Sequence, residues 1–353
     1  MADLRTNVRA WIGPAAGLLL CALGVGITVG LLAASFASAG VRGWDAVTYL
    51  AAGERLNAGH DLYALGPGDR WVWINPPYWT VPLLSPPLIA VLWRPLAALP
   101  NEWGIAVWWV VSAAAIAIVA FGLIGQLPLA TGVALILLAP SLAWELGVAN
   151  VNGLLIAGTA SVWILVRGGR SGWAGGVVAV MAAVKLWPIV LLAWFVARRR
   201  WDAVGWFVIV GLIATLVSIA GAGLEAHLQY LSVVGATPPS AFSLAGMFAS
   251  MGIAIPWISY LVLAFGLGEV WALRSRPELS YAVAVGTMIV GSPVVNGNTY
   301  AVLLAALVPF AWPLQPPRTS RLEGGDASPG VDDRRPTLHE PNVIHVDEGR
   351  RAG

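Results

Sequence analysis

Two ionisable side chains stand out from a chain that is otherwise strongly apolar. Asp45, in the sequence GWDAVTYL at residues 43–50, directly follows the first long apolar segment. Lys185, the only lysine, lies in the middle of another apolar segment, where a charged group costs about 2.5 to 3.5 kcal/mol on insertion scales. A carboxylate can take a proton from a hydroxyl, and an ammonium group can hold an anion such as a phosphate. Together they could serve proton abstraction and phosphate binding.

The residues around Asp45 predict a short helix that lies along the membrane surface. Trp44, Val47 and Ala51 recur at helical spacing, and Gly59 follows as a stop signal. Asp45 and Tyr49 then share the other face. An aspartate in a first turn can cap the helix, a role worth about 0.5 to 2 kcal/mol, or it can do chemistry. The local pattern leaves both roles open.

Other polar residues form two candidate groups. The candidates for phosphate binding carry positive or titratable side chains: Lys185, Arg55, Arg70 and His227. The second group carries amides, which both donate and accept hydrogen bonds and so can bind hydroxyl groups, or aromatic rings: Tyr49, Tyr63, Asn75, Tyr78, Asn150, Asn152, Asn296 and Asn298. Each has a structural alternative, such as an ordinary loop charge, a helix-end contact or an interfacial anchor.

The elements that must position these residues are membrane helices. The chain has 353 residues, of which 58% are hydrophobic and 11% charged, with 19 tryptophans and a mean hydropathy of +0.76. Soluble domains carry roughly a quarter charged residues. We therefore expect an all-α integral membrane protein. The predicted spans, about ten, lie near residues 11–38, 79–93, 103–124, 128–143, 149–166, 173–197, 202–222, 252–273, 279–293 and 299–314.

The basic residues predict the orientation of this bundle. Arg5 and Arg9 precede the first span, so the positive-inside rule puts the N-terminus in the cytoplasm and Asp45 outside. Ten crossings return the C-terminus to the cytoplasm, and Arg94, Arg198–Arg200, Arg274 and Arg276 then fall inside as well. Arg167 and Arg170 disagree with this count. An alternative is that the segment around Lys185 is a broken pair of half-helices that dips in from the cytoplasm.

The domain boundaries follow from composition. Residues 1–314 form the membrane domain, with long outer loops at about 40–78 and 223–251. Loops of this length are often functional. Residues 315–353 are rich in charge, proline and glycine, which predicts a disordered cytoplasmic tail.

Several short motifs carry a resemblance to a known family. They are WDAVTYLAAGERLNAGHDLY and INPPYWTVPLLSPP in the first outer loop, then LGVANVNGLL, AVMAAVKLWP and VGSPVVNGNTY farther along. The chain resembles glycosyltransferase family 87, the polyprenyl-phosphate-mannose-dependent mannosyltransferases with a GT-C fold, over about residues 10 to 314. Asp45, Tyr49, Gly59 and Tyr63 match the family pattern, as does the pair Pro76 and Pro77.

The resemblance implies a function and a mechanism. It implies a GT-C-type helical bundle that moves mannose from polyprenyl-phosphate mannose to a lipid-linked glycan, such as a phosphatidylinositol mannoside or lipomannan. Asp45 would be the general base, and the anomeric carbon would invert. The sequence departs from the family pattern at Ala149, where glutamine is usual, and at Asn296, Asn298 and Thr299, where a histidine and an aromatic residue are usual.

Partners and alternatives follow from the same reasoning. The expected partners are the donor lipid, the acceptor lipid and membrane lipids, without nucleic acid or a cofactor, at the plasma membrane with the active site outside. No Asp-x-Asp pair occurs in the loops and no cluster has metal-ligand spacing, so we expect no metal. A polyprenyl-phosphate arabinofuranose donor, a transporter or flippase for a lipid-linked substrate, and an inactive scaffold stay open as alternatives.

Overall fold

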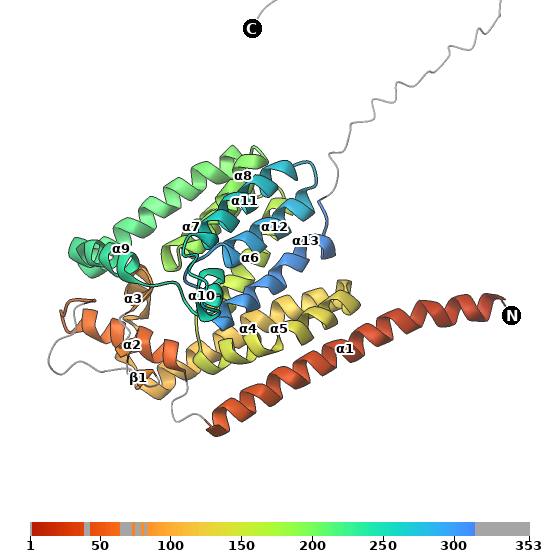
Figure 1. Cartoon of the computed structure of the whole chain (residues 1–353), viewed down its shortest axis with the longest axis horizontal. Coiled ribbons are helices and arrows are strands. Elements are labelled where there is room, and N and C mark those ends of the chain that lie inside the picture. Colours follow the sequence, from red (N-terminus) through yellow and green to blue (C-terminus); the bar gives the residue numbers. More distant parts are fainter. Residues whose placement is uncertain (1, 39–42, 64–72, 75–78, 81–82, 315–353) are drawn as a thin grey trace, which may run out of the picture. The chain divides into compact units, whose positions relative to one another are not determined.

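The chain folds into a bundle of helices (Figure 1). The computed structural model describes residues 2–38, 43–63, 73–74, 79–80 and 83–314. The α-helices are α1 (Ala2–Ser38), α2 (Trp44–Asn57), α3 (Pro87–Trp93), α4 (Asn101–Gln126), α5 (Pro128–Val148), α6 (Asn152–Arg167), α7 (Ser171–Val184), α8 (Val190–Ala197), α9 (Trp201–Ala236), α10 (Leu244–Ser250), α11 (Ile258–Ala272), α12 (Pro277–Val290) and α13 (Val308–Ala311). The 3-10 helices are η1 (Leu96–Ala98), η2 (Trp187–Ile189) and η3 (Gly297–Leu307). The strands β1 (Trp73–Ile74) and β2 (Trp79–Thr80) pair antiparallel, with Trp73 opposite Thr80.

The outer surface of the bundle is apolar, as a lipid environment requires. Within the described residues, four helices are long and apolar enough to cross a membrane: α1 from Gly13 to Ala37, α4, α5 and α9. Shorter apolar helices complete the bundle. Leu19, Phe121 and Leu137 are each more than 70% exposed, which suits contact with lipid rather than water. The apolar helices confirm the expected membrane protein, while the ten spans are not confirmed.

The bundle has two ends that differ in character. At one end, which we call the α2 end, the start of α2 meets the end of α5 because Gly43 N donates to Gly147 O at 3.0 Å. At the other, which we call the arginine end, Arg198 Nη1 donates to Arg274 O, and Arg167 Nε donates to Pro313 O at 3.3 Å. Figure 1 shows α2 and α3 at one end, and the end of α13 at the other.

Helix α1 runs parallel to α5. A Cβ at Gly17 would lie 2.6 Å from Leu129 N, and one at Gly24 would lie 2.7 Å from Leu135 Cβ, so both positions need glycine for this close approach. Since α5 starts at the arginine end, α1 starts there too. The helices that run between the two ends are α1, α4, α5, α6, α9, α11, α12 and η3 with α13.

The segment 173–197 is a helical hairpin and not a continuous span. Ser171 Oγ, at the start of α7, bonds Asp202 at the start of α9, and α8 ends just before α9 at Ala197. Helices α7 and α8 therefore enter from the arginine end and return to it. Lys185 at the turn is extended, with φ −143° and ψ 132°, and Pro188 lacks the N–H that a continuous helix would use.

The hairpin is packed into the core by aromatic rings. Trp194 of α8 lies 5.6 Å from Trp163 of α6 and 4.9 Å from Tyr281 of α12, measured between ring centroids, and all three rings are fully buried. The break into two half-helices, expected as the alternative, is thus confirmed, while their entry from the cytoplasm stays a prediction. They also put Arg167, at the end of α6, at the same end as the Arg198 loop.

The predicted span at 79–93 is wrong. Strand β2 and the seven-residue α3 occupy its described part. Three prolines interrupt this segment, which is also shorter than the roughly 20 residues that a span needs. Arg94 follows α3 and bonds Asn57 Oδ1, at the end of α2, at 2.9 Å. It therefore lies at the α2 end, and the prediction that it falls with the other arginines is wrong.

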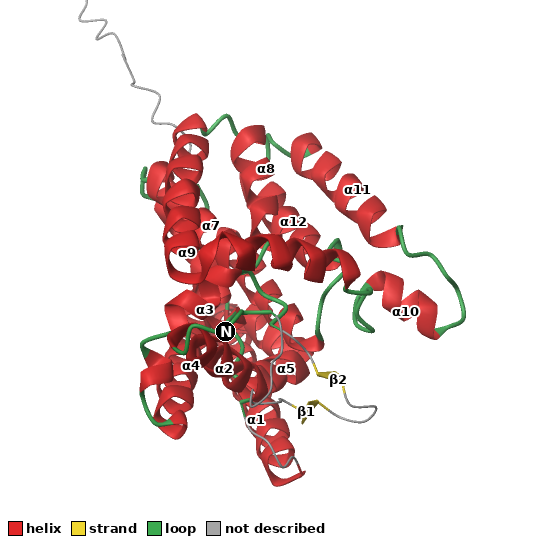
Figure 2. Cartoon of the chain, turned by 90° about the vertical axis from the view of Figure 1, so that its left-hand side faces the viewer, coloured by secondary structure: helices red, strands yellow, loops and turns green. Residues whose placement is uncertain are grey.

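The predicted outer loop at 223–251 is largely helical. α9 continues to Ala236 after a kink at Gly223, where φ is 79°, and α10 follows. Figure 2 shows α10 near the start of α11. Part of the first outer loop, namely residues 40–42, 64–72 and 75–78, and the predicted tail lie outside the described residues.

Candidate active site

A polar cluster lies at the α2 end, surrounded by the apolar bundle. Its members come from segments far apart in the sequence, namely α2, the end of α5, the α5–α6 turn, the apex of the α7–α8 hairpin and the start of η3. They are Asp45, Tyr49, Glu145, Asn150, Asn152, Lys185 and Asn298. All except Glu145 were predicted as site residues, and the structure brings them together.

Asp45 bonds across the bundle rather than to its own helix. The N-cap of α2 is Gly43, in a left-handed conformation with φ 69°, and no side chain caps the helix. The Asp45 carboxylate instead accepts a hydrogen bond from Asn150 Nδ2, with 2.5 Å between Nδ2 and Oδ2. The interpretation of Asp45 as a side-chain cap is therefore wrong. The side chain is aimed at the α5–α6 turn.

The α5–α6 turn presents Asn150 by an unusual backbone. Ala149 has a φ of 54°, a left-handed conformation that non-glycine residues rarely adopt, and it is fully buried. Asn150 Oδ1 accepts the backbone N–H of Val151 at 2.6 Å, which fixes the amide and leaves Nδ2 facing Asp45. Strained backbone of this kind is concentrated at functional sites.

Glu145 is the centre of the buried part of the cluster. Its carboxylate is fully buried and accepts hydrogen bonds from Asn152 Nδ2 at 2.9 Å, Gly153 N at 3.0 Å and Asn298 Nδ2 at 2.9 Å. A Cβ at Gly153 would lie 2.1 Å from Ser112 Oγ, so the start of α6 is held tightly against α4. One carboxylate thus joins α5, α6 and η3.

Lys185 brings a positive charge close to two carboxylates. Its Nζ lies 3.4 Å from Asn152 Oδ1, and its charge acts on both Asp45 and Glu145. The break between α7 and α8 frees Lys185 from the helix and places it at the apex of the hairpin. A buried carboxylate and a nearby ammonium partly compensate each other's loss of hydration.

Burial divides the cluster into two layers. Asp45 and Lys185 are only half-buried, whereas Glu145, Asn152 and Asn298 are buried. Asp45 and Lys185 can therefore meet a substrate, while the other three support them from behind.

Burial also raises the pKa of the Asp45 carboxyl above its ordinary value, and the Asn150 hydrogen bond and the Lys185 charge act in the opposite direction. A carboxylate with a raised pKa is a stronger base, but it is protonated over a wider range of acidic pH. Asp45 thus combines access to a substrate with the basicity that proton abstraction needs.

Two tyrosines border the cluster through Ser85. Tyr49 is buried on α2 and packs against Trp93 with 5.4 Å between ring centroids and an angle of 52° between the rings. Its hydroxyl faces Ser85 and the backbone of Val151. Tyr63 Oη donates to Ser85 O at 2.7 Å. The hydroxyls of both tyrosines are therefore tied to protein groups.

Three of the predicted site residues lie apart from the cluster. Arg55, near the other end of α2, donates from Nε to Asp61 O at 2.9 Å. His227 lies on the kinked part of α9, where its ring nitrogens pair with Gly223 O at 2.8 Å and Ser218 Oγ at 2.9 Å. Asn296 is exposed before η3. The structure does not support these three as members of this site.

Arg70, Asn75 and Tyr78 lie outside the described residues, and their roles stay predictions. Within the described part of the chain, no group of three His, Cys, Asp or Glu side chains could hold a metal ion.

Comparisons with known proteins identify the family. The sequence model of glycosyltransferase family 87 matches residues 84–293, more than half of the chain. No curated protein and no solved structure gave a significant match. The matched region contains Glu145, Asn150 and Lys185, and the hydrogen bonds described above connect Asp45 and Asn298 to them although both lie outside the match. The chain belongs to glycosyltransferase family 87 and is a membrane glycosyltransferase.

Proposed function

We propose that this glycosyltransferase moves mannose from polyprenyl-phosphate mannose to a lipid-linked glycan, such as a phosphatidylinositol mannoside or lipomannan. The observation that carries the proposal is that a half-buried carboxylate, Asp45, and the ammonium group of Lys185, whose charges act on each other, lie in the same polar cluster of an apolar bundle. Sugar transfer from a lipid phosphate to a hydroxyl needs a base at the acceptor oxygen and a cation at the leaving phosphate. These two residues supply that pair.

In the proposed reaction, the acceptor hydroxyl attacks the anomeric carbon of the donor. A new carbon–oxygen bond forms as the bond between the anomeric carbon and the phosphate oxygen breaks, with inversion. Asp45 takes the hydroxyl proton, and polyprenyl phosphate leaves with the bonding electrons. Asn150 donates to Asp45 Oδ2, so we assign the incoming hydroxyl to Oδ1. General-base help of this kind is worth about 10²- to 10⁴-fold.

Lys185 stabilises the phosphate as its negative charge grows. A fixed cation stabilises charge that develops in the transition state more effectively than water does. Asn152 Oδ1 lies 3.4 Å from Nζ, which leaves the other ammonium protons to face the phosphate. Glu145 holds Asn152 in turn, and we regard Glu145 as a positioning residue because it is fully buried.

The distribution of arginines supports an active site on the outer face of the plasma membrane. The loops at the arginine end carry Arg167, Arg170, Arg198–Arg200, Arg274 and Arg276. By the positive-inside rule this end is cytoplasmic, with both termini, and the α2 end is outside. Lipid-linked donors present their sugars there, whereas nucleotide sugars are found in the cytosol. This argument favours a lipid-linked donor.

One experiment tests the proposal and its alternatives. Purified full-length protein is given labelled polyprenyl-phosphate mannose and a lipid acceptor extract, with the variants Asp45→Asn and Asp61→Asn alongside. Asp61 is exposed and lies in the same loop region, so it serves as the matched control. We expect transfer by the wild type, a loss of at least 100-fold for Asp45→Asn, and no more than a twofold change for the control.

The outcomes separate the alternatives. Full activity of Asp45→Asn would refute the catalytic role of Asp45. Transfer from polyprenyl-phosphate arabinofuranose and not from the mannose donor would make the protein an arabinofuranosyltransferase. Movement of donor lipid across a vesicle membrane without any transfer would instead identify a flippase, and the proposal would fail.

A further inference from the structure

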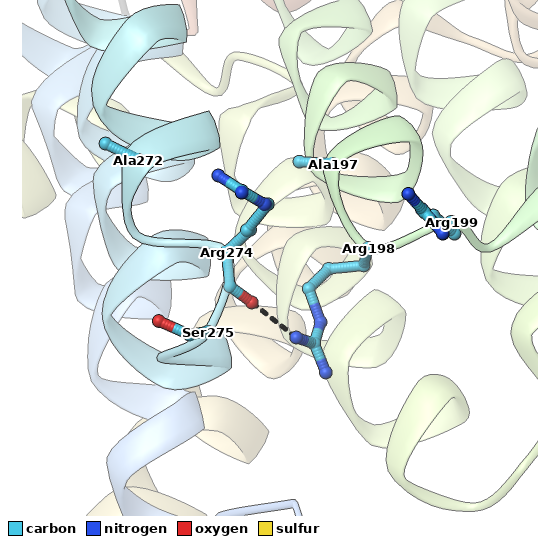
Figure 3. A pocket seen from close by; sticks show the side chains of 6 residues that line it. All are labelled: Ala197, Arg198, Arg199, Ala272, Arg274 and Ser275. Carbon is cyan, nitrogen blue, oxygen red and sulfur yellow. Dashed lines mark hydrogen bonds between the residues drawn. The ribbon is translucent and has the colours of Figure 1, made fainter.

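A basic pocket lies at the arginine end, remote from the candidate active site. It is about 430 Å³ in volume and lies between the α8–α9 loop and the end of α11. Its lining consists of small residues and arginines: Ala197, Arg198, Arg199, Ala272, Arg274 and Ser275. Figure 3 shows Arg198 and Arg274 on opposite walls, joined by one hydrogen bond. A volume of this size is within the range of small-molecule sites.

The arginines of this pocket are held in place by backbone and ring contacts. Arg198 Nη1 donates to Arg274 O, and Arg274 Nη1 donates to Trp271 O at 3.0 Å. The Arg274 guanidinium carbon lies 5.3 Å from the centroid of the Trp271 ring. These contacts fix the guanidinium groups while leaving most of their N–H groups for another partner, since each has five.

Within the part of the chain that the structure describes, no carboxylate pairs with these arginines. Among the described residues, Arg198, Arg199 and Arg274 form no ion pair with a carboxylate, and Arg198 Nε is buried without a hydrogen-bond partner. Glu278 acts on Arg198 electrostatically, but its Oε1 accepts the backbone N–H of Leu314 at 3.0 Å. An anion in the pocket would satisfy both the buried donor and the excess of positive charge.

Burial and the neighbouring Arg200 lower the pKa of the Arg198 guanidinium, the direction expected for a cation whose charge lacks compensation. The backbone here is also unusual. Arg199 has a φ of 54°, in the left-handed region that glycine adopts more readily. A residue with a long charged side chain at such a position points to a role for the loop, because strained backbone tends to occur at functional sites.

The position of the pocket identifies where its ligand comes from. The pocket lies where the apolar helices α8 and α11 end, and the ends of apolar helices are where lipid head groups are expected. Trp201 and Trp271 are 61% and 51% exposed at this same end, which is typical of side chains at a membrane–water interface. A ligand at this depth is more readily presented by the membrane than by the solvent.

We propose that this pocket binds the phosphate group of an anionic phospholipid head group, with Arg198 and Arg274 as its main ligands. Guanidinium groups match phosphate oxygens in a bidentate arrangement, and basic pockets between membrane helices bind lipid head groups. The small side chains of Ala197, Ala272 and Ser275 leave the room that the head group needs. This site is independent of the proposed sugar transfer, which takes place at the other end of the bundle.

The test measures lipid binding directly. Full-length protein in detergent is titrated with phosphatidylglycerol or phosphatidylcholine, and bound lipid is counted by native mass spectrometry. We expect Arg274→Gln to weaken phosphatidylglycerol binding at least tenfold without affecting phosphatidylcholine, because charge-assisted hydrogen bonds are lost. Arg276→Gln, an exposed arginine outside the pocket lining, removes the same charge and should change binding less than twofold.

Two further arms make the proposal falsifiable. Arg198→Lys keeps the charge but loses the bidentate geometry, so phosphatidylglycerol binding should weaken severalfold. Millimolar inorganic phosphate should not displace the lipid; displacement would identify a site for free phosphate and overturn the proposal. Equal losses for Arg274→Gln and Arg276→Gln would overturn it too, since binding would then follow net charge rather than the pocket.

Discussion

The Glu145 carboxylate offers the sharpest test of how the candidate active site is built. It accepts three hydrogen bonds, two at Oε2 from Asn152 and Asn298 and one at Oε1 from Gly153 N. In Glu145→Gln, a carbonyl oxygen can replace Oε2 and keep both asparagine contacts. The new NH2 group then faces the Gly153 N–H, with a separation of 3.0 Å in the wild type. One buried donor loses its partner, which costs about 1 to 3 kcal/mol.

The alanine variant removes all three contacts. It also leaves Lys185 without one of its two nearby carboxylates. Removing one partner from a buried charged network costs about 3 to 5 kcal/mol, so we expect Glu145→Ala to be the less stable variant. Glu225→Gln, on the exposed side of α9, is the control and should change stability by less than about 0.5 kcal/mol.

The assay is unfolding of the purified protein in mixed micelles with increasing SDS, followed by tryptophan fluorescence. We expect the free energy of unfolding to fall in the order control, Gln variant, Ala variant. Sugar transfer by the folded Gln variant should decrease through kcat, because Lys185 would lose the charge of one of its two nearby carboxylates. If both Glu145 variants were as stable as the control, the hydrogen-bonded carboxylate would not be what joins α5, α6 and η3, and the reasoning would be refuted.

Two other predictions concern pH and orientation. If Asp45 is the base, kcat/KM rises as the pH passes through the raised Asp45 pKa. The lysine charge lowers that pKa, so Lys185→Gln should shift this rise in kcat/KM to higher pH. A rise at the same pH in both proteins would contradict the charge interaction. In a Cys21→Ser background, an impermeant thiol reagent applied to intact cells should label a cysteine at Ala58 and not one at Ser275, since they lie at opposite ends of the bundle; the reverse pattern would invert the proposed orientation.

Composition and motif spacing predicted the general architecture and most of the polar cluster. Asp45, Asn150, Lys185 and Asn298 stand in separate motifs, each of which is weak alone. The structure brings these motifs together because the turns between helices at the α2 end all face the same interior space. Polar residues are rare in apolar segments because burying them costs free energy, so these residues could be selected from the sequence as candidates.

Hydropathy alone could not distinguish spans from other apolar segments. The segment at 79–93 has the composition of a span, but its prolines and its length prevent one. The segment at 173–197 is long enough, but Lys185 and Pro188 divide it into a hairpin that returns to the arginine end. A helix break lets the chain reverse within an apolar environment only where other helices surround it, as α6 and α12 do here.

Glu145 was not selected as a site residue, because its partners lie beyond the helix that contains it. The donors that bond it from nearby in the sequence are the Asn152 side chain at +7 and the Gly153 backbone N–H at +8, which on one continuous helix would lie about two turns away. Ala149 ends α5 in a left-handed backbone conformation that changes the direction of the chain. The N-terminus of α6 therefore turns back over the Glu145 carboxylate. An acid shortly before a helix break in an apolar segment therefore indicates a buried hydrogen-bond acceptor. The break exposes backbone and side-chain donors that only a nearby acceptor can satisfy. Asn298, which is far away in the sequence, donates a hydrogen bond to the same carboxylate from η3, and only the folded chain reveals that contact.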